Sequence, residues 1–337
     1  MTPKERLHRR IKGEKVDKIP NLNITMLFAA AYAGIPYGKF CSDYRYLVEA
    51  QIKTAEDFGI DILSTMSDPF RETSDYGAFV EFAEDDLPIC REILLRTPED
   101  LDKIKSWNPE ESVRMLDRIR AVEYYRINMG EQYPVLGWVE GALAEFADLA
   151  HLQEMMIYLV EEPEFAHEVL ERLTEQQIAC AKAQIRAGAD VIGIGDACAS
   201  LINSAMYREF ALPYERRMVE AIQGEGALVK LHICGNISHL LGDVRQTGAD
   251  IIDIDSLVNL ETAADVLGDC CSVCGNSDPT IILLQGSTEK VEADVTRCIH
   301  TLNDRGIISA GCEVPRATPV ENLRTVDRVL RERSVKQ

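Results

Sequence analysis

The sequence is poor in basic residues and in long apolar runs, and each deficit excludes a class of protein. Its 337 residues carry 36 Lys and Arg against 56 Asp and Glu, which gives a net charge of −20. A protein that binds nucleic acid or an anionic membrane needs a basic face, so neither partner is expected. No run reaches the roughly 18 uncharged apolar residues of a membrane span. The N-terminus MTPKERLHRRIKG also lacks the apolar part of a secretion signal.

Disulfides are not expected either, although cysteine itself is present. Ten cysteines occur in a chain without a recognisable secretion signal. Such a chain is expected in a reducing compartment, where cysteines serve as free thiols or as metal ligands. The interpretation is therefore a cytoplasmic protein.

A glycine followed at once by a short β-branched run recurs along the chain. Glycine is common directly after the last turn of a helix, and runs this apolar are typical of strands buried on both faces. Helices that alternate with such strands indicate βαβ units and a parallel sheet. The four junctions are Gly59–Leu63, Gly188–Ile192, Gly248–Ile252 and Gly306–Ile308.

Eight segments can be counted as strands, and eight strands suit a closed (β/α)8 TIM barrel of the α/β class. They are residues 20–27, 60–66, 133–139, 190–195, 228–234, 250–255, 271–275 and 307–312. We predict a single barrel domain over residues 1–337, with an N-terminal helical extension that Thr2 caps. A doubly wound open sheet is the structural alternative. It is disfavoured because no Gly-x-Gly-x-x-Gly follows the first predicted strand.

Two further helix starts follow from capping patterns. The gap between the second and third predicted strands, about 67–132, is too long for one helix, so we expect an extended loop plus helices there. Thr97 precedes Pro98 and is predicted to start one of them. The last helix is predicted to begin at Thr318, in a Thr-Pro-Val-Glu sequence that has the pattern of a capping box.

Three residues predict a metal site. His232 and Cys234 are two apart at the end of the predicted strand 228–234, so their side chains point to the same side. Cys312 stands at the same place on the last predicted strand. The carboxyl ends of all barrel strands face one mouth, where the active sites of such barrels are assembled. Two thiolates and one imidazole suit zinc, and three protein ligands leave a fourth position open for a substrate.

Other cysteines favour a simpler interpretation. A His-x-Cys pair alone is more often a packed histidine and a core cysteine, so the site depends on the third ligand, Cys312. Cys271 and Cys274 form a Cys-x-x-Cys, but no second pair completes a four-cysteine site. We expect both to be core thiols of an apolar strand.

Three motifs connect these ligands to a known family. The chain resembles the uroporphyrinogen decarboxylase superfamily over nearly its whole length. Within that superfamily it is similar to the cobalamin-linked methyltransferases, such as methylcobalamin:coenzyme M methyltransferases and the methyltransferase components of O-demethylases. The resemblance implies a (β/α)8 barrel in which His232, Cys234 and Cys312 bind zinc. The motifs are HICGN at 232–236, GNSDP at 275–279 and GCEVPRATPVEN at 311–322.

Departures from the motifs of the family limit the reactions that the chain is expected to catalyse. The decarboxylases carry an arginine-rich motif after the first strand, whereas residues 21–30 here read NLNITMLFAA without arginine. A substrate with many carboxylates would therefore meet few cations, and decarboxylation is disfavoured.

The chain also has nothing like the Asp-x-His-x-x-Gly motif of corrinoid-binding proteins. We therefore expect cobalamin, or another corrinoid, to be supplied by a partner protein that docks over the barrel mouth.

Acidic residues at predicted strand ends are candidates for catalysis. Asp68, Glu140 and Asp196 follow the second, third and fourth predicted strands, and we interpret these three as catalytic. Each could orient His232, protonate a leaving oxygen or fill the vacant zinc position. A strand-end carboxylate is as often a helix cap or the partner of an arginine. Glu72 and Asp255 occupy comparable places.

The methyl donor or acceptor is the least determined part of the hypothesis. A sulfonated thiol would need cations, and Arg71 and Arg316 are the candidates in these acid-rich loops. A neutral O-methyl donor such as a methoxyarene is therefore preferred, with a coenzyme M-type thiol methyltransferase as the alternative. A decarboxylase-like lyase and a non-catalytic barrel partner are further alternatives, and a homodimer is a candidate assembly. The mouth is predicted to be lined by Met26, Phe28, Met66, Phe70, Tyr76 and Trp138.

Overall fold

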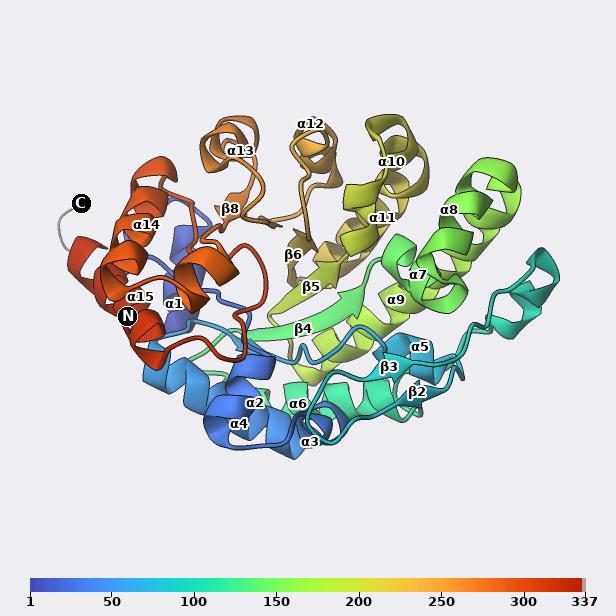
Figure 1. Ribbon diagram of the computed structural model, residues 1–337, viewed down its shortest axis with the longest axis horizontal. Helices are drawn as coiled ribbons and strands as arrows, with labels where there is room; N and C mark the ends of the chain where they lie inside the picture. Colours follow the sequence, from blue (N-terminus) through green and yellow to red (C-terminus); the bar gives the residue numbers. More distant parts are fainter. Residues whose placement is uncertain (335–337) are drawn as a thin grey trace.

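Six parallel strands form the curved sheet at the centre of the protein (Figure 1). The computed structural model describes residues 1–334. Each strand of this sheet pairs with the sheet's next strand in chain order, so the order of strands across the sheet never reverses. A doubly wound sheet would reverse its order, whereas a barrel does not. The strands are β1 (Leu63–Ser64), β4 (Val135–Glu140), β5 (Val191–Gly195), β6 (Leu228–Ile233), β7 (Ile251–Ile254) and β8 (Ser272–Cys274).

Two further segments close the ring between β8 and β1 without forming regular strands. Single parallel bridges join Asn21 to Ile308 and Cys274 to Ile307. The backbone N–H of Ile307 donates to Val273 O at 2.9 Å, and that of Asp61 donates to Asn21 O at 2.8 Å. The segments predicted as strands 20–27 and 307–312 therefore lie where a barrel needs them.

Side chains explain why these two segments are not continuous strands. The backbone N–H of Asn21 donates to the Asp61 carboxylate at 2.8 Å, and that of Ala310 donates to Asn23 Oδ1 at 2.7 Å. Backbone donors that bind side chains are lost to a strand ladder. The prediction of eight regular strands is therefore wrong for the first and last segments, although their positions in the ring are as expected.

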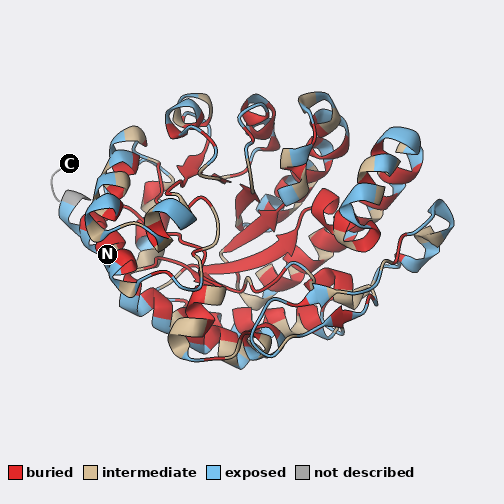
Figure 2. Cartoon of the chain, in the orientation of Figure 1, coloured by how far each residue is buried: buried red, intermediate tan, exposed pale blue. Residues whose placement is uncertain are grey.

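Helices surround the sheet and bury their inner faces against it (Figure 2). The longest is α9, Pro163–Ala187, which ends at Gly188 with a φ of 114°. Glycine adopts this left-handed conformation without strain, which accounts for Gly59, Gly188 and Gly248 at three of the four predicted junctions. Gly306 has no positive φ and lies beyond the end of its helix, so the expectation is wrong there. The other helices are α1 (Pro3–Arg10), α2 (Leu27–Ala33), α3 (Tyr37–Ser42), α4 (Tyr44–Phe58), α5 (Arg71–Asp75), α6 (Arg114–Met129), α7 (Ala142–Ala150), α8 (Leu152–Glu161), α10 (Ser204–Phe210), α11 (Leu212–Gly224), α12 (Leu241–Val244), α13 (Leu260–Leu267), α14 (Thr288–Thr301) and α15 (Val320–Ser334).

The capping predictions have different outcomes. Thr2 caps α1, because its hydroxyl accepts from the backbone N–H of Glu5 at 3.1 Å. Thr97 starts a helix as predicted, but a short 3₁₀ helix, Pro98–Lys103. Thr318 is buried and its hydroxyl has no hydrogen-bond partner, so the predicted cap of α15 is wrong.

The long connection from β1 to α6 holds a hairpin as well as helices. Strands β2 (Val80–Glu81) and β3 (Ile89–Cys90) pair in antiparallel fashion, apart from the main sheet. Short 3₁₀ and π turns complete the fold at Ala197–Leu201, Arg245–Thr247 and Pro279–Leu284. Within residues 1–334, no helix combines the length and the apolar character that a membrane crossing requires.

The interior of the barrel accommodates one large side chain, that of Trp138 on β4. Trp138 is 1% exposed, and glycines of the neighbouring strand β5 make room for it. A Cβ added at Gly193 would lie 2.2 Å from the indole ring, and one added at Gly195 would lie 2.7 Å from it. The two glycines are therefore required by packing rather than by backbone conformation.

We predict that Gly193→Ala destabilises the fold by about 1–3 kcal/mol, because the added methyl group overpacks the barrel against Trp138. Gly224→Ala is the matched control, since an added Cβ there meets nothing within 4 Å. Denaturant unfolding of both variants measures the effect. A Gly193→Ala protein as stable as the control would contradict the packing argument.

Candidate metal centre

The end of β6 presents a histidine and a cysteine toward the last segment of the ring. His232 is the fifth residue of β6, and Cys234 follows the strand directly. His232 Nε2 lies 2.9 Å from Cys234 Sγ, which lies 3.6 Å from Cys312 Sγ. The ligand atoms of all three residues fall within 4.8 Å of one another. The ring closure therefore brings together the three residues that the sequence singled out.

The three side chains fit a divalent metal with an affinity for nitrogen and sulfur. Cys234 and Cys312 are free thiols and half-buried, while His232 is 3% exposed. A hydrogen bond from Cys234, followed by one from His232, lowers the pKa of the Cys312 thiol to about 4. The contact between the two thiols thus favours the thiolate at Cys312, and the thiolate is the form that binds metals. Two sulfurs and one imidazole are a donor set of the catalytic zinc type, with one position open.

Asp253 on β7 is a member of the site that sequence reasoning missed. It lies opposite His232 in the strand register. Its Oδ2 lies 3.1 Å from His232 Nδ1, although the ring N–H is poorly aligned with it. Burial lowers the pKa of His232, but Asp253 and Cys312 outweigh it and raise that pKa to about 9. A carboxylate behind a histidine ligand is a common way of fixing the ring.

Lys230, also missed, binds the same carboxylate. Its ammonium donates to Asp253 Oδ2, and both side chains are almost fully buried. Burial raises the pKa of Asp253, but the charge of Lys230 and then the contact with His232 lower it below its usual range. The sequence shows each of them as a lone charge in an apolar strand, but it does not show that the two charges pair.

Asp255 braces the turn that follows Cys234. Its Oδ2 accepts from the backbone N–H of Gly235 at 2.9 Å, and its Oδ1 accepts from that of Leu257 at 2.9 Å. Gly235 has a φ of 89°, a left-handed conformation that favours glycine. The carboxylate therefore fixes the loop on which Cys234 stands.

Asp68, one of the predicted catalytic residues, forms a buried ion pair. Arg114 donates to both of its oxygens, at 2.7 and 3.1 Å, and Ser67 donates to one of them at 2.7 Å. Burial alone would raise the pKa of Asp68, but the charge of Arg114 holds it well below its usual range. Asp68 is therefore a carboxylate at neutral pH and already bound on both oxygens.

Glu140 lies in a buried group of acids at the end of β4. Its Oε1 accepts from Trp138 Nε1 at 2.9 Å. Burial, together with the nearby charge of Glu72, raises the pKa of Glu140 well above its usual range. Burial likewise raises that of Asp148 to about 8. Asp148 can therefore hold a proton near neutral pH.

Asp196 connects the end of β5 to its surroundings. Its Oδ1 accepts from the backbone N–H of Ala144 at 2.9 Å, near the start of α7. Its own backbone N–H donates to His232 O at 3.0 Å. Burial raises the pKa of Asp196 to about 7. Neither Asp68, Glu140 nor Asp196 belongs to the group of ligand atoms around His232 in the described chain. The carboxylate that contacts His232 is that of Asp253.

Several other predicted residues lie in packed or paired positions. Phe28 packs against Phe58 at a ring-centroid distance of 5.5 Å and is 2% exposed. Cys271 and Cys274 are buried, as expected of core thiols. Arg71 is fully buried and donates to Asp117 at 2.9 Å. Arg316 pairs with Asp85 on the surface.

We predict that Asp68→Asn costs about 3–5 kcal/mol at pH 7, because it leaves Arg114 buried without its counter-charge. The folded pKa of Asp68 lies below the unfolded value of about 4. Its stabilisation is therefore complete above that pH and is lost as the pH falls. Asp57→Asn, in an exposed pair with Lys53, should cost less than about 1 kcal/mol. Unfolding between pH 3 and pH 7 measures both, and equal costs at all pH values would contradict the ion-pair argument.

Comparison with known proteins places the whole chain in one family. A family model described as uroporphyrinogen decarboxylase (URO-D) matches residues 2–333. A methylcobamide:CoM methyltransferase MtbA of Methanosarcina mazei is 29% identical, over 96% of this chain and 95% of its own length. A methylated-thiol–coenzyme M methyltransferase of the same organism is 28% identical, over 98% and 90%.

A solved structure agrees with the fold. A methyltransferase from Methanosarcina mazei superposes with a TM-score of 0.90 at 22% identity, and 99% of each chain is covered. At this identity the superposition shows the fold alone, a barrel of the TIM type. The family match shows more, and the resemblance read from the sequence is confirmed: the chain belongs to the uroporphyrinogen decarboxylase (URO-D) family.

Proposed function

We propose that the protein is a zinc-dependent methyltransferase that moves a methyl group between a corrinoid and a thiol. The convergence of His232, Cys234 and Cys312 carries the proposal. Relatives that align over nearly the whole chain act, by their names, on methylcobamide and on coenzyme M. Decarboxylation of a tetrapyrrole has no use for a site with two cysteines and a histidine.

Zinc would be held by the three ligands, with the fourth position left to the substrate sulfur. When bound, zinc acts as a Lewis acid that lowers the pKa of a coordinated thiol. Asp253 steadies the ring of His232 from behind, at 3.1 Å. Asp255 fixes the turn after Cys234. The protein therefore supplies a rigid ligand set on one wall of the barrel mouth.

The transfer to a thiol is balanced without an added oxidant or reductant. The thiol loses its proton, and its sulfur attacks the methyl carbon of the methylated corrinoid. A carbon–sulfur bond forms while the carbon–cobalt bond breaks, and the bonding pair stays on cobalt.

We propose that Glu140 and Asp196, as predicted from the sequence, take part in moving the proton. Burial raises the pKa of both carboxyls, that of Asp196 to about 7, and a raised pKa suits a group that exchanges protons. Asp68, bound by Arg114, would act by positioning its neighbours rather than by proton transfer.

A thiol replaces the methoxyarene that the sequence favoured. That preference rested on a shortage of cations, but the relatives name a thiol coenzyme rather than an O-methyl donor. Arg71 and Arg316, the candidate anchors for a sulfonate, are paired with Asp117 and Asp85. We therefore infer that the sulfur, rather than a distant anionic group, contributes most to acceptor recognition.

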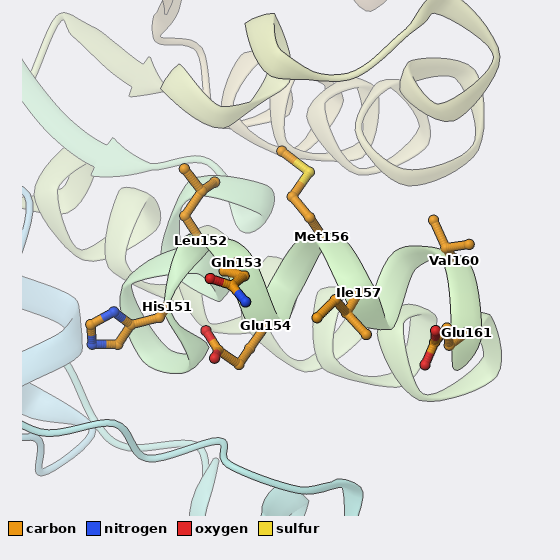
Figure 3. A pocket seen from close by; sticks show the side chains of 8 residues that line it. All are labelled: His151, Leu152, Gln153, Glu154, Met156, Ile157, Val160 and Glu161. Carbon is orange, nitrogen blue, oxygen red and sulfur yellow. The ribbon is translucent and has the colours of Figure 1, made fainter.

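Exposed apolar side chains surround the mouth and suit a docking partner. They occur in segments that follow β1, β5, β7 and β8, at Phe79, Leu201, Leu257 and Ile281, each at least 59% exposed. Helix α8, which follows β4, adds an apolar face beside a hollow (Figure 3). Leu152, Ile157 and Val160 of this face are 44–70% exposed. Exposed apolar surface of this kind marks interaction sites. We propose that the corrinoid-carrying partner docks here.

Other expectations from the sequence stay predictions. They are a single domain over residues 1–337, of which residues 335–337 lie outside the described part, a homodimer and a cytoplasmic location.

We predict that the purified protein binds one zinc ion and that Cys312→Ser loses most of it. Cys298→Ser, at a buried cysteine that does not belong to the ligand group, is the control. With free methylcobalamin, the wild type should methylate 2-mercaptoethanol and 2-mercaptoethanesulfonate at rates within about tenfold of each other. That range corresponds to about 1.4 kcal/mol in barrier height. The loss of the methylcobalamin absorption spectrum reports the transfer.

The competing functions give different results in the same assays. A protein that releases carbon dioxide from uroporphyrinogen and binds no zinc would be a decarboxylase. A protein that binds zinc, yet changes no corrinoid spectrum with either thiol or with a methoxyarene, would be a non-catalytic partner. Methylation of cob(I)alamin by a methoxyarene, without transfer to thiols, would show that the substrate is an O-methyl donor, as the sequence favoured.

We predict that the double replacement Ile157→Glu and Val160→Glu lowers the rate of methyl transfer from a methylated corrinoid protein at least about tenfold. A loss of this size is expected when apolar anchors are removed from an interface. The rate with free methylcobalamin should be unchanged. Ile127→Glu, on α6 and 81% exposed, is the control. Equal losses with both corrinoids would show that α8 serves the fold rather than docking.

A further inference from the structure

Charged side chains are rare in the barrel strands, and two of them lie beside the metal ligands. In the six described parallel strands, Asp, Glu, Lys and Arg are limited to Glu140, Lys230 and Asp253. Lys230 and Asp253 are each 1% exposed. A charge at that depth persists only when it is paired, so the two residues depend on one another.

The strand geometry aims both residues at the histidine ligand. Lys230 and His232 are two apart on β6, so their side chains share one side of the sheet. Asp253 stands opposite His232 on β7. The Lys230 ammonium donates to Asp253 Oδ2, and the same oxygen lies 3.1 Å from His232 Nδ1. One carboxylate oxygen thus joins a buried lysine to the rear nitrogen of the imidazole.

The front nitrogen of that imidazole faces the thiols. His232 Nε2 lies 2.9 Å from Cys234 Sγ. The Asp253 carboxylate lies against the rear nitrogen at ion-pair distance, so its position limits how the imidazole can turn. The carboxylate is in turn held by Lys230, on the same strand as His232. The orientation of the ligand therefore depends on a residue that contacts no ligand atom.

We propose that Lys230 is a positioning residue of the metal centre, which anchors Asp253 so that Asp253 holds the Nε2 of His232 toward the two cysteines. This inference rests on the proposed function, because it takes the three ligands as a zinc site. It assigns to Lys230 a role beyond that of a structural ion pair in the core.

The chain offers a matched control in a second buried lysine. Lys18 is 3% exposed and lies 3.0 Å from Asp327 and 3.3 Å from Asp61. It has the same chemistry and comparable burial, but it contacts none of the ligands. Loss of Lys18 reports the general cost of removing a buried lysine.

The experiment is a double-mutant cycle read as zinc affinity. Wild type, Lys230→Met, Asp253→Asn and the double variant are compared by competition with a chromophoric zinc chelator at one pH. Lys18→Met is the control. The visible spectrum of each protein with Co²⁺ in place of zinc reports the coordination geometry. Neither measurement requires methyl transfer.

We expect Lys230→Met to lower zinc affinity about 10- to 100-fold, as is usual when the support of a ligand is removed. Its Co²⁺ bands should also shift. In the Asp253→Asn background the same replacement should add less than about threefold, because the two residues act as one unit. Lys18→Met should keep the wild-type zinc affinity and the wild-type Co²⁺ spectrum.

Wild-type zinc affinity in Lys230→Met, or losses that multiply in the double variant, would overturn the proposal. If Lys230→Met does not fold, the smaller change Lys230→Gln decides, because wild-type affinity in it would exclude a positioning role and a loss with shifted Co²⁺ bands would support one. A wild-type chain that binds no zinc contradicts the proposed function itself. Intact binding in the variants contradicts only the role of Lys230.

Discussion

The parallel alignment of the barrel strands is the constraint on which the metal centre depends. Because every strand runs in the same direction, the carboxyl ends of β6 and of the last ring segment meet at one mouth. The alternation of side chains then places His232 and Cys234 on one side. Cys312, far away in the sequence, reaches Cys234 at 3.6 Å. Without closure of the ring, the three ligands would not meet.

The ligands could be predicted from the sequence because their signal is local. A two-residue spacing before a glycine places His232 and Cys234, and a matching strand end places Cys312. The residues that support them could not be found in this way. Asp253 and Lys230 stand on different strands, and their pairing requires the register between β6 and β7. Sequence reasoning instead chose Asp68, Glu140 and Asp196 as catalytic, and beside β7 it noted only Asp255, which braces a turn.

The difference between local spacing and tertiary contacts also explains the outcomes for the predicted acidic residues and for the first and last ring segments. A carboxylate at a strand end can be identified from spacing, but its partner cannot. Asp68 is bound by Arg114 of α6, and Asp196 by the start of α7, and both partners depend on tertiary packing. The first and last ring segments have strand-like sequences, yet Asn23 and Asp61 take over backbone donors that a strand ladder would use.

Because side chains replace part of the backbone ladder at segments 20–27 and 307–312, the ring has an irregular junction there, which we call the seam. The seam passes beside the metal ligands. His232 and Cys234 belong to the continuous wall of the sheet, whereas Cys312 follows the segment that closes the ring through single bridges. A metal ion held by all three ligands therefore spans the seam and fastens the closing segment to the wall. Because such an ion binds only the closed ring, its binding free energy adds to the stability of the closure. Under the proposed function, the ion would therefore be a structural latch as well as a reagent.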